Sequence, residues 1–348
     1  MNSFTKVICF LFLLLKTTHL LATPFESENS FTPAKLIPKS HNVKEVPHAT
    51  RLEGWVYMSY IVDVDGKTKD IEILAYSTKG ANLHHAYKRV ESLRYEAALY
   101  KGKPVESAKT YLLKHTISFY GSNNEGISTG YRYGFNRVDK YLQTKEFTKA
   151  KSELDQLNED HSKNLTEQAL TAWLYSNYYA SQKDWSNYGE MVQIANHLRE
   201  MLPTKMAIKN SQNLLSYYEF TQQYADAVNT VYKMKNIKNA EIKPDTIKAM
   251  ILPLSKKLNS SVAIKIEANL KKDIAWQYSV GRKVLSVKVE QGKLDSAQFR
   301  CTNVVYNIEM DNLNSIVIPN DFHNCSFLLK GAEGSKIIIT EKNQTQLL

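Results

Sequence analysis

The chain has 348 residues, of which 43% are hydrophobic and 23% are charged, and this composition excludes a wholly disordered or collagen-like protein. A chain longer than about 250 residues usually forms more than one hydrophobic core, so we expect two or three domains. The 45 basic residues outnumber the 35 acidic ones, but the excess is spread along the chain, which argues against a nucleic-acid-binding protein.

Residues 1–23 have the three-part pattern of a secretory signal peptide. A lysine precedes the apolar run Val7–Leu15, Lys16 interrupts that run, and Ala22 offers a cleavage point. A membrane-spanning helix needs ~20 apolar residues, about twice the length of this run. We therefore predict an exported protein, and the alternative is an uncleaved membrane anchor over Val7–Ala22.

Two cysteines remain once the signal segment is removed. Cys301 and Cys325 form an even pair in a chain that is predicted to enter an oxidising compartment, so we expect a disulfide between them. Closing the intervening loop would contribute on the order of 3 kcal/mol by the chain-entropy model. The alternative is a pair of buried thiols. A metal site is disfavoured, because two cysteines with His323 nearby provide too few ligands.

The next segment begins with a proline-containing stretch. Residues 24–53 hold four of the nine prolines and show little periodicity, so we expect an extended linker. The following block, 54–120, opens with two runs of alternating residues on either side of the turn Asp65–Lys67. That pattern predicts a β-hairpin.

The same block continues with a helix and a third strand. Apolar residues between Leu83 and Leu93 fall at helical spacing and form one stripe of a helix. The run TYLLKHTISF, residues 110–119, predicts the last strand, so the block has the order ββαβ. The Gly/Ser/Asn-rich run 121–130 then marks a domain boundary.

Residues 131–260 show a degenerate helical repeat. Three segments align on an aromatic residue, and these aromatics, which are 38 and 39 residues apart, are Phe147, Trp185 and Tyr224. A period of this length is typical of stacked helix pairs, so we predict repeats of the tetratricopeptide kind. The alternative is an irregular helical bundle whose aromatic residues are simply part of the core.

Residues 270–345 return to short runs of β-forming residues separated by turns. Six or seven strands at this spacing predict a small antiparallel β-sandwich. The predicted fold is therefore α+β and multidomain, with a ββαβ domain, a helical repeat block and a C-terminal sandwich.

The second block resembles a known family over residues 46–120. Glu53-Gly54 opens the first strand, VDVDGK carries the turn, Tyr95 follows the helix, and Gly102–Val105 precedes a strand that ends in ISF. Together these motifs resemble the C-terminal domain of TonB, the periplasmic energy transducer, although the family's Tyr-Pro before the first strand is reduced here to Val46-Pro47. The resemblance implies a periplasmic location and, as partner, an outer-membrane receptor that contributes a short strand. An uncleaved N-terminal segment would instead anchor the protein in the inner membrane, facing the periplasm.

The last strand of this block is the candidate binding element. An unpaired strand edge offers backbone donors and acceptors to an extended peptide, and the family resemblance implies pairing at this edge. We predict that the more polar alternating set contacts the partner, namely Leu112, Lys114, Thr116 and Ser118. The other set, which contains Tyr111 and Leu113, would face the helix. The alternative is that the linker or the helical repeats cover this edge.

No catalytic motif is found in the sequence. It contains no HExxH, GxSxG, P-loop or GxGxxG pattern, and Asp63 and Asp65 match part of a calcium loop that has Ile61 at its first position. We therefore expect no catalytic residues, cofactor or metal, and predict a non-catalytic protein-interaction module. The alternatives are a secreted scaffold, an enzyme, or a sugar- or ligand-binding protein whose C-terminal sandwich holds the ligand.

Overall fold

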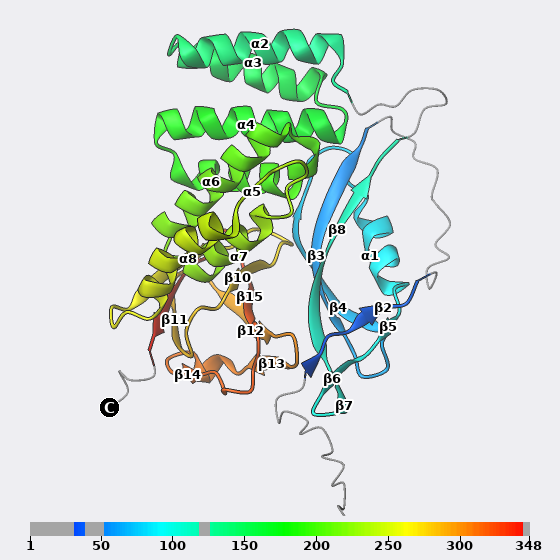
Figure 1. Cartoon of the computed structure of the whole chain (residues 1–348), viewed down its shortest axis with the longest axis vertical. Helices are drawn as coiled ribbons and strands as arrows, with labels where there is room; N and C mark the ends of the chain where they lie inside the picture. The colour runs from blue at the N-terminus through cyan, green and yellow to red at the C-terminus, as the bar shows by residue number, and fades with distance from the viewer. Residues whose placement is uncertain (1–30, 39–51, 118–125, 344–348) are drawn as a thin grey trace, which may run out of the picture.

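The computed structural model of the chain describes residues 31–38, 52–117 and 126–343. The protein is a mixed α+β structure in which the N-terminal sheet lies beside a stack of helices and the C-terminal sheets lie below its lower end (Figure 1). The predicted signal segment, Val46-Pro47 and Ser118 lie outside the described residues.

The N-terminal block is built on a three-stranded antiparallel sheet. Strands β3 (Gly54–Val62), β4 (Thr68–Tyr76) and β8 (Ser107–His115) lie in the order β4-β3-β8, and α1 (Leu83–Glu91) covers one face (Figure 1). One face of the sheet and one stripe of α1 share an apolar core that includes Val56, Met58, Ala86 and Val90. The predicted order ββαβ is therefore present in this block.

Part of the expected linker belongs to this block. Strand β1 (Phe31–Thr32) pairs with β6 (Ala98–Tyr100), and β2 (Lys35–Leu36) pairs with β5 (Tyr95–Glu96). A further hairpin strand, β7 (Lys103–Val105), pairs with β6. The prediction of a linker was thus wrong for these residues, because strands of two residues are held by backbone hydrogen bonds and leave no hydrophobic period to read.

The middle of the chain forms helices that pack in sequence order, each against the next (Figure 1). Their bounds are α2 (Thr129–Gln143), α3 (Phe147–Asp160), α4 (Leu165–Gln182), α5 (Trp185–His197), the 3₁₀ turn η1 (Arg199–Met201), α6 (Thr204–Phe220), α7 (Tyr224–Met234) and α8 (Pro244–Leu258).

The three aromatic residues of the predicted period occupy equivalent positions. Phe147, Trp185 and Tyr224 are the first residues of α3, α5 and α7. Two residues earlier, each connecting turn has one left-handed residue: Lys145 (φ 59°), Lys183 (φ 56°) and Gln222 (φ 59°). In each turn the residue before the aromatic donates its N–H to a carbonyl five residues earlier, over 2.9, 3.0 and 2.8 Å. The period is therefore a repeat of one helix–turn–helix unit.

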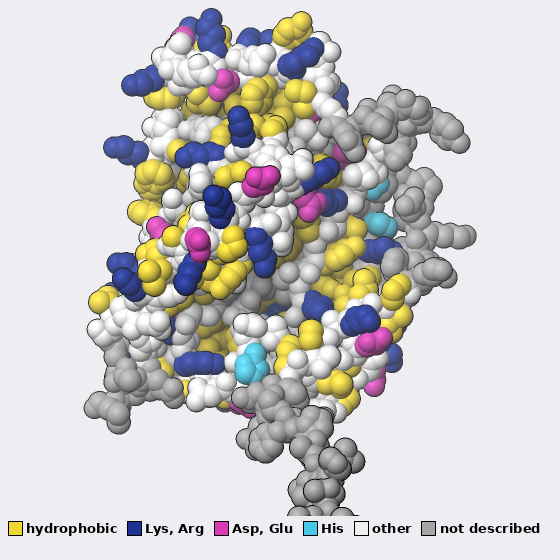
Figure 2. Space-filling view, in the orientation of Figure 1, with side chains coloured by type: hydrophobic (Ala, Val, Ile, Leu, Met, Phe, Trp, Pro, Cys, Tyr) yellow, Lys and Arg dark blue, Asp and Glu magenta, His cyan; other side chains and the backbone are white. Residues whose placement is uncertain are grey.

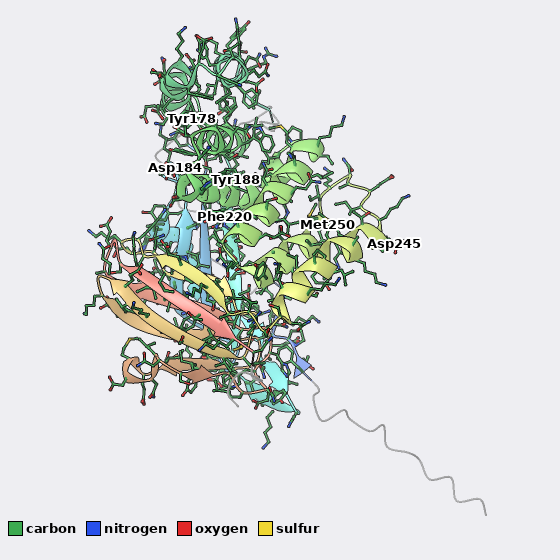
Figure 3. The ribbon with its side chains drawn as sticks, turned by 90° about the vertical axis from the view of Figure 1, so that its left-hand side faces the viewer. Tyr178, Asp184, Tyr188, Phe220, Asp245 and Met250 are labelled. Carbon is green, nitrogen blue, oxygen red and sulfur yellow. A yellow bond between two sulfur atoms is a disulfide. The ribbon has the colours of Figure 1, made fainter. Side chains whose placement is uncertain are left out.

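Aromatic side chains connect successive units. Figure 3 shows Tyr178, Tyr188 and Phe220 following one another down one side of the stack. The ring centroids of Trp185 and Phe220 are 5.8 Å apart, and those of Tyr188 and Tyr217 are 6.2 Å apart. The aromatic residues of the helical block therefore contact one another both within helices, as in the stacked pair Tyr175 and Tyr179, and across the boundary between α5 and α6.

The C-terminal block contains two four-stranded antiparallel sheets, with the orders β10-β15-β12-β13 and β14-β11-β16-β9. Their inner residues form one apolar core, which includes Tyr278, Phe299, Phe327 and Ile339. The strands are β9 (Ile264–Asn269), β10 (Trp276–Ser279), β11 (Val284–Gln291), β12 (Leu294–Arg300), β13 (Val305–Ile308), β14 (Ile316–Val317), β15 (Ser326–Gly331) and β16 (Lys336–Lys342).

Two of these strands depart from the sequence-based prediction. Strand β9 begins before the predicted boundary at residue 270, yet it pairs along its whole length with β16. Strand β12, with the sequence LDSAQFR, lies in the centre of its sheet. Its polar residues interrupt the apolar alternation by which a strand is recognised in a sequence. The block therefore begins at Ile264, six residues earlier than expected.

Candidate functional site

Strand β8 lies at an edge of the N-terminal sheet, because its one neighbour in that sheet is β3. The N–H of Ala108 donates to the carbonyl of Cys301 over 2.9 Å, so the backbone groups of Ala108 point away from β3. Successive residues of a strand point their backbone groups to opposite sides. The outward set therefore continues with Thr110, Leu112 and Lys114.

This assignment agrees with the other side of the sheet. Trp55 lies opposite Lys114 in the register, and its backbone groups bond to Ser77, just after β4: its N–H donates to the Ser77 hydroxyl and its carbonyl accepts from the Ser77 N–H, both over 3.0 Å. Among the described residues, no backbone group accepts from or donates to the outward groups of Thr110, Leu112 and Lys114. Over these five residues, about 14 Å of strand, the edge is open with respect to the part of the chain that the structure describes.

The two faces of β8 are occupied differently. Tyr111 and Leu113 pack into the core beneath α1, as the alternation predicted. Leu112 packs against the helical block, in the cluster that contains Trp55, and the ammonium of Lys114 lies 2.6 Å from a carboxylate oxygen of Glu200. The helices thus cover the face that carries Leu112 and Lys114, so these two side chains are not free to contact a partner. The outward backbone groups of the strand remain as the candidate contact surface.

The other two predicted residues lie elsewhere. Thr116 is exposed and follows the end of β8 at His115, so it belongs to no ladder. Ser118 lies outside the described residues. The predicted strand 110–119 therefore begins three residues too late, since β8 begins at Ser107. Ser107 and Ala108 break the apolar alternation in the sequence, but they still pair with β3.

A buried carboxylate holds the upper end of β8 against the helices. Glu53 is 9% exposed, and its two carboxylate oxygens accept from the N–H of Ile117 (3.0 Å) and of Leu165 (2.8 Å). Leu165 is the first residue of α4, where unpaired N–H groups and the helix dipole favour a negative charge. Gln168 donates to the Glu53 carbonyl over 2.6 Å. Glu53 therefore connects the edge strand to the repeat block.

Farther down the same face, α5 places a histidine against the sheet. The His197 ring centroid lies 4.4 Å from that of Tyr57 and 5.7 Å from that of Trp55. Burial, together with the nearby charges of Lys233 and Arg199, lowers the pKa of His197 to about 4. The imidazole is therefore neutral at pH 7 and acts as a packing group.

Figure 2 shows a hollow in the middle of the surface, between the helices and the two groups of sheets. Burial raises the pKa of Asp226, on α7, to about 6, although the N–H of Ser279 donates to its carboxylate over 3.1 Å. Burial also lowers the pKa of Lys233, and repulsion from Arg199 acts in the same direction. Lys233 therefore has a cation, Arg199, and a weakened acid, Asp226, close enough to act on it.

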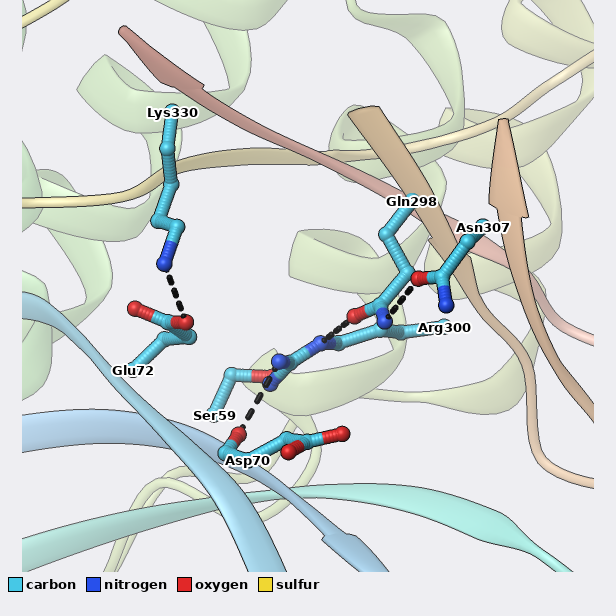
Figure 4. Close-up of polar contacts among 7 residues, drawn as sticks. All are labelled: Ser59, Asp70, Glu72, Gln298, Arg300, Asn307 and Lys330. Atoms are coloured by element: carbon cyan, nitrogen blue, oxygen red, sulfur yellow. Dashed lines mark hydrogen bonds and ion pairs between the residues drawn. The ribbon is translucent and has the colours of Figure 1, made fainter. Parts of the chain in front are cut away.

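A polar contact fixes the C-terminal block beneath the sheet (Figure 4). Arg300, which is 3% exposed, donates to the hydroxyl of Ser59 and to the carbonyl of Asp70, both over 2.9 Å. Lys330 forms an ion pair with Glu72 at 2.7 Å. These contacts hold β12 and β15 against β3 and β4, so the edge of β8 has a fixed place relative to both neighbouring blocks.

The predicted cysteine pair lies next to the lower end of β8. The sulfur atoms of Cys301 and Cys325 are 2.07 Å apart, which is bonding distance for a disulfide. Because the carbonyl of Cys301 accepts from Ala108, the disulfide and the strand edge are parts of one contact.

Sequence patterns did not predict that Glu53 connects the edge strand to the helices, nor that His197, Asp226 and Lys233 lie near one another. These residues come from separate blocks and form no motif, so only the packing of the blocks brings them together. Within the described part of the chain, no group of three or more His, Cys, Asp or Glu side chains is placed to hold a metal ion.

No helix among the described residues combines the length and the apolar character that crossing a membrane requires. No protein-family model matches the sequence, and no curated protein matches it significantly. The resemblance to the TonB C-terminal domain therefore stays a prediction.

Proposed function

We propose that the chain is an exported, non-catalytic protein-interaction module that binds an extended segment of a partner by adding a strand to β8. The observation that carries this proposal is the open edge at Thr110, Leu112 and Lys114, whose outward backbone groups have no backbone partner among the described residues. An extended peptide can satisfy these groups without any rearrangement of the sheet. Backbone pairing supplies affinity, and the surrounding side chains supply selectivity.

The fold supports a family assignment for each block. The ββαβ order with α1 on one face supports a TonB C-terminal-like domain, and the equivalent turns before α3, α5 and α7 support tetratricopeptide-like repeats. Two four-stranded sheets around one core support a β-sandwich. On this basis the partner is a periplasmic or outer-membrane protein of the TonB-dependent receptor type, and the disulfide is compatible with a periplasmic location.

The charges beside the edge indicate the chemistry of the partner segment. Lys114 lies on the edge strand, Arg199 lies in η1 next to the Glu200 that pairs with Lys114, and Lys233 lies on α7. Glu200 neutralises Lys114, whereas Arg199 and Lys233 form no ion pair within the described part of the chain. A segment with acidic side chains would therefore be favoured over a basic one.

A proline at Thr110 tests the mechanism. Its side chain is exposed and its N–H points outward, so Thr110→Pro removes one free donor while the ladder to β3 stays intact. Thr110→Val is the matched control, because it keeps the N–H. Peptides of eight residues are first selected from a displayed library on the unmodified protein, and their affinities for both variants are then measured by fluorescence anisotropy.

We expect the selected peptides to lose affinity for Thr110→Pro and to keep it for Thr110→Val. In the complex, amide exchange should slow at Thr110, Leu112 and Lys114. Peptides that bind the proline variant as tightly as the parent, or that protect amides elsewhere, would refute strand addition at β8.

A further inference from the structure

A cavity opens between the two sheets of the C-terminal block, away from the β8 edge. Its volume is about 270 Å³. The residues that line it come from β12, β13, β14 and the segments that join them: Phe299, Tyr306, Ile308, Glu309, Asn312, Ser315, Ile316, Val317, Pro319 and Phe322. The cavity is therefore a feature of one end of the shared core.

The lengths of the strands explain why the core is open here. Strand β13 has four residues and β14 has two, and each is the last strand of its sheet on this side. The chain between them, which contains the 3₁₀ turn η2 (Met310–Asn312), forms no strand, and one backbone bond ties it to β11, from the N–H of Val287 to the carbonyl of Leu313 over 2.8 Å. The sheets thus separate at this end, and Phe299, Ile308 and Ile316, which are at most 7% exposed, form the floor.

One wall of the cavity is held rigidly. The ammonium of Lys283 donates to the carbonyls of Pro319 (3.2 Å) and Phe322 (3.0 Å). The side chain of Asn303 donates to the Asp321 carbonyl over 2.6 Å and accepts from the His323 N–H over 2.9 Å. The disulfide joins the end of this segment, at Cys325, to Cys301. A wall fixed in this way loses little conformational freedom when a ligand binds.

The lining combines an apolar floor with a rim of hydrogen-bond acceptors. Three aromatic rings and two isoleucines contribute the apolar part. Glu309, Asn312 and Ser315 contribute the polar part, in which Glu309 accepts from Asn312 over 3.1 Å, and no lysine or arginine lines the cavity. An apolar cavity of about 150 Å³ holds benzene, so this larger one has room for a ring with a short substituent.

We propose that this cavity binds a small molecule made of one ring-sized apolar body and a protonated amine or hydroxyl group. The ring packs on the isoleucine and phenylalanine floor, and the donor group meets the carboxylate of Glu309 at the rim. This ligand site is separate from the β8 edge, because no lining residue belongs to the N-terminal or helical block.

Two phenols with the same two-carbon side chain test the proposal on the full chain: tyramine, which ends in an amine, and 4-ethylphenol, which lacks it. Binding is measured by ligand-observed NMR titration. We expect both to bind, with tyramine binding about tenfold more tightly, because a hydrogen bond to a charged group is stronger than one to a neutral group. Glu309→Gln should remove this preference.

Ser315→Trp is the second variant, because Ser315 is exposed at the rim and a tryptophan there would fill the cavity without disturbing the core. Asn314→Trp, at the neighbouring exposed residue that does not line the cavity, is its matched control. Both probes should lose binding to Ser315→Trp and keep it for Asn314→Trp. Absence of binding to the parent, or equal binding to the two tryptophan variants, would overturn the proposal.

Discussion

Replacing Glu341 by glutamine should change how the stability of the chain depends on pH. Glu341 lies on β16, is 1% exposed, and accepts hydrogen bonds from the hydroxyl of Tyr278 and the N–H of Gly281, both over 3.0 Å. The pKa of Glu341 is raised from 4.5 to about 7, chiefly by burial and with a contribution from Asp226, although the two hydrogen bonds and Arg282 oppose the shift.

The sign of the effect follows from proton binding. Between pH 4.5 and 7 the folded chain holds a proton at Glu341 that the unfolded chain releases. The stability that this proton represents is complete below pH 4.5 and is lost as the pH rises through 7. A shift of this size corresponds to a free energy of unfolding on the order of 3 kcal/mol.

The assay is urea unfolding at pH 5 and pH 8, with the C-terminal transition followed by near-ultraviolet circular dichroism. Glutamine does not titrate, so the free energy of unfolding of the parent relative to Glu341→Gln should be higher at pH 5 than at pH 8 by about 3 kcal/mol. Glu333→Gln, at an exposed residue in the turn between β15 and β16, controls for general charge effects. A difference that is the same at both pH values, or larger at pH 8, would refute the reasoning.

Two further substitutions test the packing of the helical block. Glu53→Gln should lower the free energy of unfolding by about 1.5–3 kcal/mol, because glutamine leaves one of the two N–H groups that Glu53 binds without its charged acceptor. Urea unfolding measures this loss, with Glu159→Gln, at an exposed carboxylate, as the control. Equal stability of the two variants would contradict the prediction. Gly189→Ala should cost about 1–3 kcal/mol, since its Cβ would overlap the ring of Tyr217. Gly126→Ala, with open space around its Cβ, is the control and should leave the stability nearly unchanged. Thermal unfolding of the two glycine variants measures the difference, and similar losses of stability in both variants would argue against the overlap.

The helical period is the part of the fold that can be predicted most directly from the sequence. Phe147, Trp185 and Tyr224 recur because the same tight turn precedes each of them, and a local turn imposes a local sequence pattern. The hairpin of β3 and β4 and the stripe of α1 are recognisable for the same reason, since each has its own period. Local structure leaves a local signal.

Contacts between blocks leave no such signal. The alternation in β8 separates Leu113 from Leu112 correctly, but it cannot reveal that helices cover the face with Leu112 and Lys114. Nor can it locate the donor of Ala108 opposite the carbonyl of Cys301, which is 193 residues later in the chain. The open edge is therefore a property of tertiary structure, and a sequence pattern identifies only the strand that carries it.

The contact between Ala108 and Cys301 also bears on solubility. A long exposed strand edge can pair with any other chain, including another copy of the same protein, and is a common starting point for aggregation. Here the C-terminal block occupies the lower end of β8, and Glu53 holds the residues that follow its upper end, so the exposed part is short. An edge of this length offers few backbone hydrogen bonds to a growing stack of strands, so the contacts at its two ends lower the tendency of the sheet to aggregate.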